Sequence, residues 1–130
     1  MPEAPLSLSV PGVTDVPGGC LKARTASPLD YVDEGLHVAY LDADRCCGRL
    51  SVRRRRPGDR FRLLGLKGEK KLQDFMVDAH IPIEARDSVP IVCDEQHIVW
   101  VAGHRLDDRV RVTADSRALL RLEYVPAAEP

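Results

Sequence analysis

The amino-acid sequence predicts an α+β fold that is rich in strands and has one or two short helices. Most apolar residues lie in short runs separated by Pro, Gly or acidic turns, which is the pattern of strands. A stripe of apolar residues at helical spacing occurs in residues 70–79. The 130 residues are 44% hydrophobic but 5% aromatic. One domain is therefore expected, with a core built mainly from Val, Leu, Ile and Ala.

Residues 1–35 are punctuated by Pro and Gly and are predicted to form an N-terminal extension or linker that carries a short hairpin. The segments 6–10 and 20–26 alternate apolar and polar residues, so each indicates a strand, and a Pro/Gly loop joins them. The domain itself is expected over residues 36–125, followed by a tail at 126–130.

The next elements are two strands and a helix. Strands are predicted at residues 36–42 and 49–56, and the second ends at the turn Pro57-Gly58. Within that strand, alternation would divide the four consecutive arginines between two faces. The helix of residues 70–79 has apolar side chains at i, i+3, i+4 and i+7. These are Leu72, Phe75, Met76 and Ala79.

The last third predicts a turn of helix and four strands. Residues 81–90 begin with proline and indicate the turn of helix, and residues 90–95 and 97–103 are apolar runs around an acidic turn, which favours a hairpin. Two further strands are expected at 109–113 and 117–125.

Formal charge is separated along the chain although it sums to −1. Residues 49–71 contain ten Lys and Arg but two acids, a charge of +8, whereas residues 1–48 carry −4 and residues 72–130 carry −5. This separation is typical of a polyanion-binding face on an otherwise acidic body.

Catalytic and metal-binding patterns are weak. Asp74 and Asp78 share a helix face, which would suit acid–base work or metal binding, but a solvated surface or pairing with Arg is the expected role. No phosphate loop, dinucleotide fingerprint or nucleophile elbow occurs. The histidines and cysteines show no spacing typical of a metal site or a disulfide framework. They are His37, His80, His97, His104, Cys20, Cys46, Cys47 and Cys93. The chain is therefore expected to have no catalytic residues, no metal and no cofactor.

The basic stretch suits backbone phosphates. Arg offers a planar fork for phosphate oxygens and Lys a mobile point charge, and Gly58, Gly65 and Gly68 would let a sugar-phosphate strand approach the main chain. Phe61 and Phe75 are the only aromatic residues nearby, which disfavours stacking on unpaired bases. Recognition of a structured RNA duplex by shape and phosphate contact is favoured.

The run VRRRRPGDRFRLLGLKGEKKLQDFMVDAHIP, followed by RDSVPIVCD, WVAGHRLDDRVRVT and RALLRLE, resembles the C-terminal domain of bacterial tRNA(Ile)-lysidine synthetase over roughly residues 50–123. SVPGVTDVPGGCLKAR resembles the strand-rich segment before that domain. The resemblance implies a β-sandwich-like core, similar to a domain of the phenylalanyl-tRNA synthetase beta-subunit, that binds the tRNA acceptor stem. Such enzymes use ATP to adenylate the wobble cytidine of tRNA(Ile) and then attach lysine. Their S-G-G-x-D-S loop is absent from this sequence.

By position, the resemblance implies RNA contacts at a set of basic residues. These are Arg53, Arg55, Arg56, Arg60, Lys67, Lys70 and Lys71, with Arg105 as a further contact. Seven phosphate contacts would give a slope of log K against log salt of about −6. Asp59 is expected to cap the turn or pair with a neighbouring Arg, and Trp100 to lie in the core. Two positions depart from the family pattern, Leu63 where proline is usual and His80 where lysine is usual.

The implied partners are tRNA and the catalytic N-terminal domain of the same enzyme, which would hold ATP and Mg. No apolar run approaches the ~20 residues of a membrane span, and the N-terminus lacks the features of a signal peptide, so a cytoplasmic protein is expected. Two alternatives remain open. One is an interaction module whose basic face docks an acidic protein surface, and the other is an enzyme built on Asp74, Asp78 and the histidines.

Overall fold

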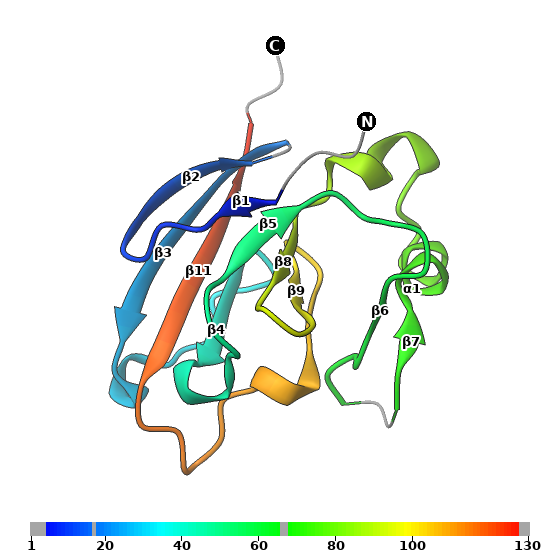
Figure 1. Ribbon diagram of the computed structural model, residues 1–130. Coiled ribbons are helices and arrows are strands. Elements are labelled where there is room, and N and C mark those ends of the chain that lie inside the picture. The colour runs from blue at the N-terminus through cyan, green and yellow to red at the C-terminus, as the bar shows by residue number, and fades with distance from the viewer. Residues whose placement is uncertain (1–4, 17, 66–67, 128–130) are drawn as a thin grey trace.

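The computed structural model describes residues 5–16, 18–65 and 68–127. Two β-sheets pack against each other, and a small hairpin with a helix covers the outer face of one of them (Figure 1). The strand-rich prediction with few helices is confirmed. None of the helices in the described ranges, of which the seven-residue α1 (Leu72–Asp78) is the longest, is long and apolar enough to cross a membrane.

The first sheet has five strands, and each neighbouring pair runs antiparallel. Their order is β1 (Leu6–Ser7), β5 (Ser51–Arg53), β8 (Ile91–Cys93), β9 (Ile98–Val101) and β10 (Arg105–Leu106). A register shift between Val92 and Cys93 precedes the turn that joins β8 to β9. The expected hairpin around an acidic turn is therefore present.

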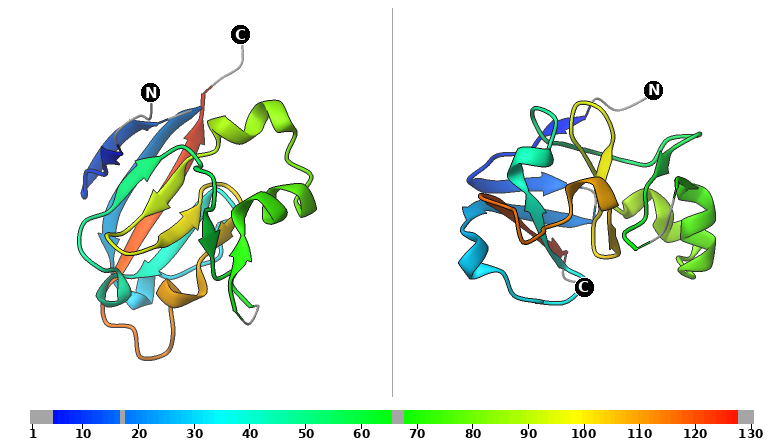
Figure 2. Two further views of the ribbon diagram at one scale, coloured as in Figure 1. Left: turned by 45° about the vertical axis from the view of Figure 1, so that its right-hand side comes forward. Right: turned by 90° about the horizontal axis from the view of Figure 1, so that it is seen from below.

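The second sheet has four strands, also antiparallel. Their order is β2 (Gly12–Val16), β3 (Gly19–Ala26), β11 (Leu119–Pro126) and β4 (Val38–Asp42). β11 is an inner strand that pairs with β3 from Leu119↔Ala26 to Pro126↔Gly19. The C-terminal strand thus ties the first third of the chain into the fold, as Figure 2 shows from two further sides.

The two sheets enclose one core and the five-stranded sheet buries its other face in a second core. Along β8, Val92 belongs to the core between the sheets, while Ile91 belongs to the core under α1 (Leu72–Asp78). On β9, Trp100 and Val101 are divided in the same way. Burial on both faces explains why β8 and β9 are continuous apolar runs rather than alternating ones. Trp100 is a core residue, as expected.

The second core is covered by β6 (Arg60–Phe61), β7 (Lys70–Lys71) and α1, with a 3-10 helix at Ile83–Ser88. Phe61 and Phe75 meet edge to face, with ring centroids 5.4 Å apart. The helix ends because His80 takes a left-handed conformation, φ 57°, and Ile81 N donates to Met76 O at 3.0 Å. This bond runs from the second residue after the C-cap residue, Ala79, to the third residue before it, as in a Schellman cap.

Three expected strands differ from the observed ones. The partner of β3 in the N-terminal hairpin is β2, from the stretch expected to be a loop, whereas the short β1 pairs with β5 in the other sheet. The sequence GVTDV also alternates, so the pattern supported either assignment. Residues 109–113 do not form a strand. Asp107 Oδ1 instead accepts from Arg109 N at 2.8 Å and caps a 3-10 helix at Asp108–Val110.

The strand expected at residues 49–56 ends at Arg53. Its backbone turns away because Asp59 Oδ2 accepts from Arg56 N at 2.7 Å, which stabilises a turn in place of sheet pairing. The expected division of the four arginines between two strand faces therefore does not apply beyond Arg53.

Candidate nucleic-acid interface

The basic region begins with a tight turn at Arg56-Pro57-Gly58-Asp59. Asp59 N donates to Arg56 O at 3.2 Å, which closes the turn. Pro57 supplies the restricted φ of the second position, and Gly58 has φ 84°, the conformation that the third position of a type II turn requires. The space where a Cβ would stand on Gly58 is open, so the backbone angle alone demands glycine here.

Asp59 has the structural role expected of it. Its carboxylate accepts from Arg53 Nη1 and Nη2 at 2.9 and 3.0 Å, a bidentate pair in which the two side chains are 13% and 11% exposed. Burial acts to lower the pKa of Arg53, but the bonds to Asp59 and neighbouring negative groups outweigh it, so the pKa lies above its usual value. Arg53 therefore holds the turn in place and points into the protein.

The turn is joined to the hairpin and the helix behind it. Leu72 N donates to Asp59 O at 2.8 Å, and in the β6–β7 pair Arg60 stands opposite Lys71. Cross-strand partners project to the same side of a sheet. These contacts bring the turn and β6, which follow each other in the sequence, to one surface with β7, which begins nine positions after β6 ends.

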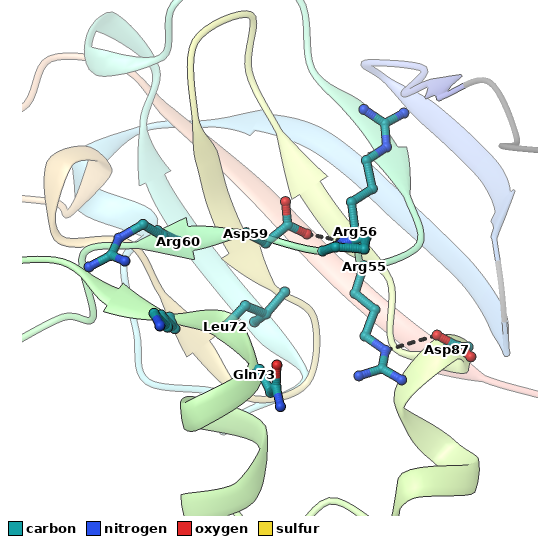
Figure 3. A pocket seen from close by; sticks show the side chains of 10 residues that line it. Arg55, Arg56, Asp59, Arg60, Leu72, Gln73 and Asp87 are labelled. Atoms are coloured by element: carbon teal, nitrogen blue, oxygen red, sulfur yellow. Dashed lines mark hydrogen bonds and ion pairs between the residues drawn. The ribbon is translucent and has the colours of Figure 1, made fainter.

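That surface contains a groove of about 460 Å³, which we call the basic groove (Figure 3). Its lining has four basic and two acidic side chains. The lining residues are Arg55, Arg56, Pro57, Gly58, Asp59, Arg60, Lys71, Leu72, Gln73 and Asp87. Figure 3 shows that Arg55 extends toward Asp87 and Arg56 in the opposite direction, so the two guanidinium groups are not gathered at one point.

Two of the four bases are held by exposed carboxylates. Arg55 Nε donates to Asp87 Oδ1 at 2.8 Å, and this hydrogen bond holds the pKa of the Asp87 carboxyl below its usual value. Arg60 Nε lies 3.7 Å from Glu69 Oε1. The side chains of Asp87 and Glu69 are 62% and 44% exposed, so each pair is screened by water and contributes little to stability. Neither carboxylate therefore holds its arginine strongly.

The other two bases, Arg56 and Lys71, are exposed. Within the described part of the chain neither side chain pairs with a carboxylate. Arg56 does contact Asp59, but through its main-chain N–H and not through its guanidinium group. Arg56 and Lys71 thus contribute two exposed positive charges, and Arg55 and Arg60 contribute two that exposed carboxylates partly balance. Gln73 adds an uncharged amide to the same lining.

The remaining predicted contacts lie elsewhere. Lys70 and Arg105 line a separate hollow of about 370 Å³ together with Phe75 and His104. There Lys70 is paired with Asp78, which also accounts for one of the two carboxylates that were weighed as catalytic. Lys67 lies outside the described residues. The structure thus brings Arg55, Arg56, Arg60 and Lys71 together and separates Arg53, Lys70 and Arg105 from them.

Sequence reasoning missed Gln73 and Asp87 as lining residues. Asp87 lies in the 3-10 helix Ile83–Ser88 and contacts Arg55, which is 32 positions away in the sequence, so no local sequence pattern predicts the contact. Gln73 was predictable in part, because it follows Lys71 by two positions at the start of the helix.

His104, in the separate hollow with Lys70 and Arg105, is half-buried. Burial, together with the nearby His37, lowers the pKa of His104.

Comparisons with known proteins identify the family and the fold of this chain. A family model described as the TilS substrate C-terminal domain matches residues 50–124. The chain is also similar to a crystal structure of a TilS C-terminal domain, with a TM-score of 0.85 and 28% sequence identity over 97% of this chain and 98% of that one. The likeness in fold therefore includes the N-terminal strands that the family model does not match.

Curated relatives of this chain are named tRNA(Ile)-lysidine synthase. A tRNA(Ile)-lysidine synthase of Caldanaerobacter subterraneus subsp. tengcongensis is 38% identical over 120 residues, 90% of this chain and 26% of the relative. One from Symbiobacterium thermophilum is 40% identical over 121 residues, 88% of this chain and 24% of the relative. The chain spans about a quarter of the length of these relatives. From the family match over more than half of its residues, the chain belongs to the TilS C-terminal domain family of tRNA(Ile)-lysidine synthases.

Proposed function

We propose that this domain binds tRNA(Ile) at the acceptor stem and that the basic groove supplies the contacts to the sugar-phosphate backbone. The observation that carries the proposal is that four bases line one groove: Arg55 and Arg56 at the start of the turn, Arg60 of β6 and Lys71 of β7. Arg56 and Lys71 have no acidic partner among the described residues, so both are available to phosphate oxygens.

The aromatic residues support a backbone-directed mode. Phe61 is fully buried and Phe75 is 6% exposed, and the two rings pack on each other. Neither ring can stack on an unpaired base. Side chains that remain at the groove suit phosphate and ribose contacts, the mode by which proteins recognise the shape of an A-form stem.

The family implies a larger task in which this domain has a supporting role. We infer that a catalytic domain of the same enzyme, in the part of the relatives that this chain does not span, uses ATP and Mg to ligate lysine to the wobble cytidine. Contacts at the acceptor stem would orient the tRNA so that its anticodon reaches that domain. Because its tRNA substrate is made and used there, the protein is proposed to act in the cytoplasm.

The two packed sheets also support the proposed likeness to a domain of the phenylalanyl-tRNA synthetase beta-subunit. A superposition of the two sheets on that domain tests it. Agreement in strand order is the expected result, and a different order would contradict the likeness.

Competition binding tests the proposed site on RNA. Fluorescence anisotropy with labelled tRNA(Ile) would compare three competitors: an acceptor-stem minihelix, an anticodon stem-loop and polyglutamate. The minihelix should compete nearly as well as the whole tRNA, and the stem-loop more weakly. If polyglutamate displaced the tRNA better than the minihelix did, the groove would be a docking surface for an acidic protein, and the RNA proposal would fail.

A further inference from the structure

A loop and a turn that are far apart in sequence meet beside the five-stranded sheet. Cys47 follows the 3-10 helix Ala43–Arg45, and Asp94 and His97 belong to the turn between β8 and β9. The Cys47 sulfur, a carboxylate oxygen of Asp94 and a ring nitrogen of His97 all lie within 4.8 Å of one another. None of the three residues lines the basic groove.

Main-chain hydrogen bonds hold the three positions in place. Asp94 Oδ2 accepts from Cys47 N at 2.8 Å, and Asp94 Oδ1 accepts from Gln96 N and His97 N at 2.8 Å each. Glu95 N donates to Cys47 O at 2.8 Å, which adds a second link between loop and turn. The main chain therefore holds the three side chains near one another before a ligand binds, so binding requires little rearrangement of the protein.

His97 contains a polar atom that its described surroundings leave unsatisfied. Its Nδ1 is buried and, among the described residues, has no hydrogen-bond partner. It lies 3.3 Å from Asp94 Oδ1, but the directions of the two groups do not make a hydrogen bond. A nitrogen and an oxygen bound to one tetrahedral Zn²⁺, each at about 2.0–2.1 Å, stand roughly 3.3–3.4 Å apart. The observed separation fits a shared metal.

We propose that Cys47, Asp94 and His97 form a Zn²⁺ site. A thiolate, an imidazole and a carboxylate are the three ligand types that zinc takes in proteins. On binding, the Cys47 thiol releases its proton to solvent and forms a Zn–S bond, while neutral His97 and ionised Asp94 each donate an electron pair. The two anionic ligands then balance the charge of the metal. In this proposal a water molecule completes the tetrahedral coordination.

The consequence of binding is mechanical. The metal would join the loop before β5 to the β8–β9 turn. β5 pairs with β8 and leads on to the basic turn at Arg56–Asp59. Since the ligands come together only in the folded chain, binding would favour the folded state by mass action. Spacing rules could not reveal the site because Cys47 and Asp94 are 47 positions apart.

Cobalt substitution of the untagged chain, freed of metal by chelation, tests the site. One equivalent of Co²⁺ should give the near-ultraviolet thiolate-to-cobalt band and the visible bands of a tetrahedral centre, and Zn²⁺ should remove both. Cys47→Ser and His97→Gln should lose affinity by more than the 10–100-fold that a neighbour of a ligand contributes. Cys46→Ser is the matched control, because the Cys46 thiol donates to Asp42 O at 3.6 Å and is outside the cluster.

Asp94 is not substituted, because three main-chain N–H groups depend on it and its loss would disrupt the turn. A second measurement is independent of the variants. At a Zn²⁺ concentration a hundred times the Kd, the unfolded population of the wild-type chain should fall about a hundredfold, and the melting temperature should rise. The site is refuted if wild-type protein gives no thiolate band and no thermal shift, or if the band persists in Cys47→Ser.

Discussion

Replacing Arg56 and Lys71 together by Gln should reduce the salt dependence of tRNA binding by a defined amount. For duplex nucleic acid, each phosphate contact contributes about −0.9 to the slope of log K against log salt. If all four bases of the groove touch phosphate, the slope is about −3.6, and affinity falls about 150-fold between 50 and 200 mM salt. The slope of about −6 expected from seven contacts also counted Arg53, Lys67 and Lys70. Arg53 is committed to Asp59 and Lys70 is paired with Asp78, and Lys67 lies outside the described residues.

The double variant should change the slope by about 1.8, which corresponds to about a 12-fold smaller loss of affinity over the same salt range. This change is independent of whether Arg55 and Arg60 also leave their exposed carboxylates for phosphate. Anisotropy titrations of labelled tRNA at five or six salt concentrations measure it. Lys22→Gln, an exposed base on β3 of the other sheet, is the matched control. A slope that is unchanged in the double variant, or equally changed by Lys22→Gln, refutes the assignment of the groove.

Three further predictions concern the scaffold. Asp59→Asn leaves the charge of Arg53 buried without its partner and should lower the free energy of unfolding by about 3–5 kcal/mol, measured by urea titration; a loss below 1 kcal/mol would contradict the role of this pair. Gly58→Ala forces a left-handed alanine into open space and should cost about 1 kcal/mol in the same assay. Hydrogen bonds from Arg121 and then Tyr40 lower the pKa of Glu34 from 4.5 to about 2, so its contribution to stability is present above pH 4.5 and is lost as the pH falls toward 2. Glu34→Gln should therefore reduce the pH dependence of the melting temperature in that window, and an unaltered profile would show that the pair is not formed in solution.

Short-range patterns determined much of this protein. The apolar stripe of α1, the paired runs of β8 and β9, the Pro-Gly turn and the capping role of Asp59 are each dictated by residues within a few positions of one another, so the sequence was sufficient to predict them. The concentration of positive charge in residues 49–71 and the family motifs also needed no structure.

Long-range pairing decided the rest. Whether Gly12–Val16 or residues 6–10 should join β3 depended on burial against a distant sheet, since both segments alternate equally well. The basic residues were predicted as one set, but their solvent exposure depends on which carboxylates the fold brings near. The fold pairs Asp59 with Arg53 and Asp87 with Arg55, and it leaves the side chains of Arg56 and Lys71 exposed to solvent. Charge is a property of the residue, whereas its availability to a phosphate is a property of the surface, and only tertiary packing sets that surface.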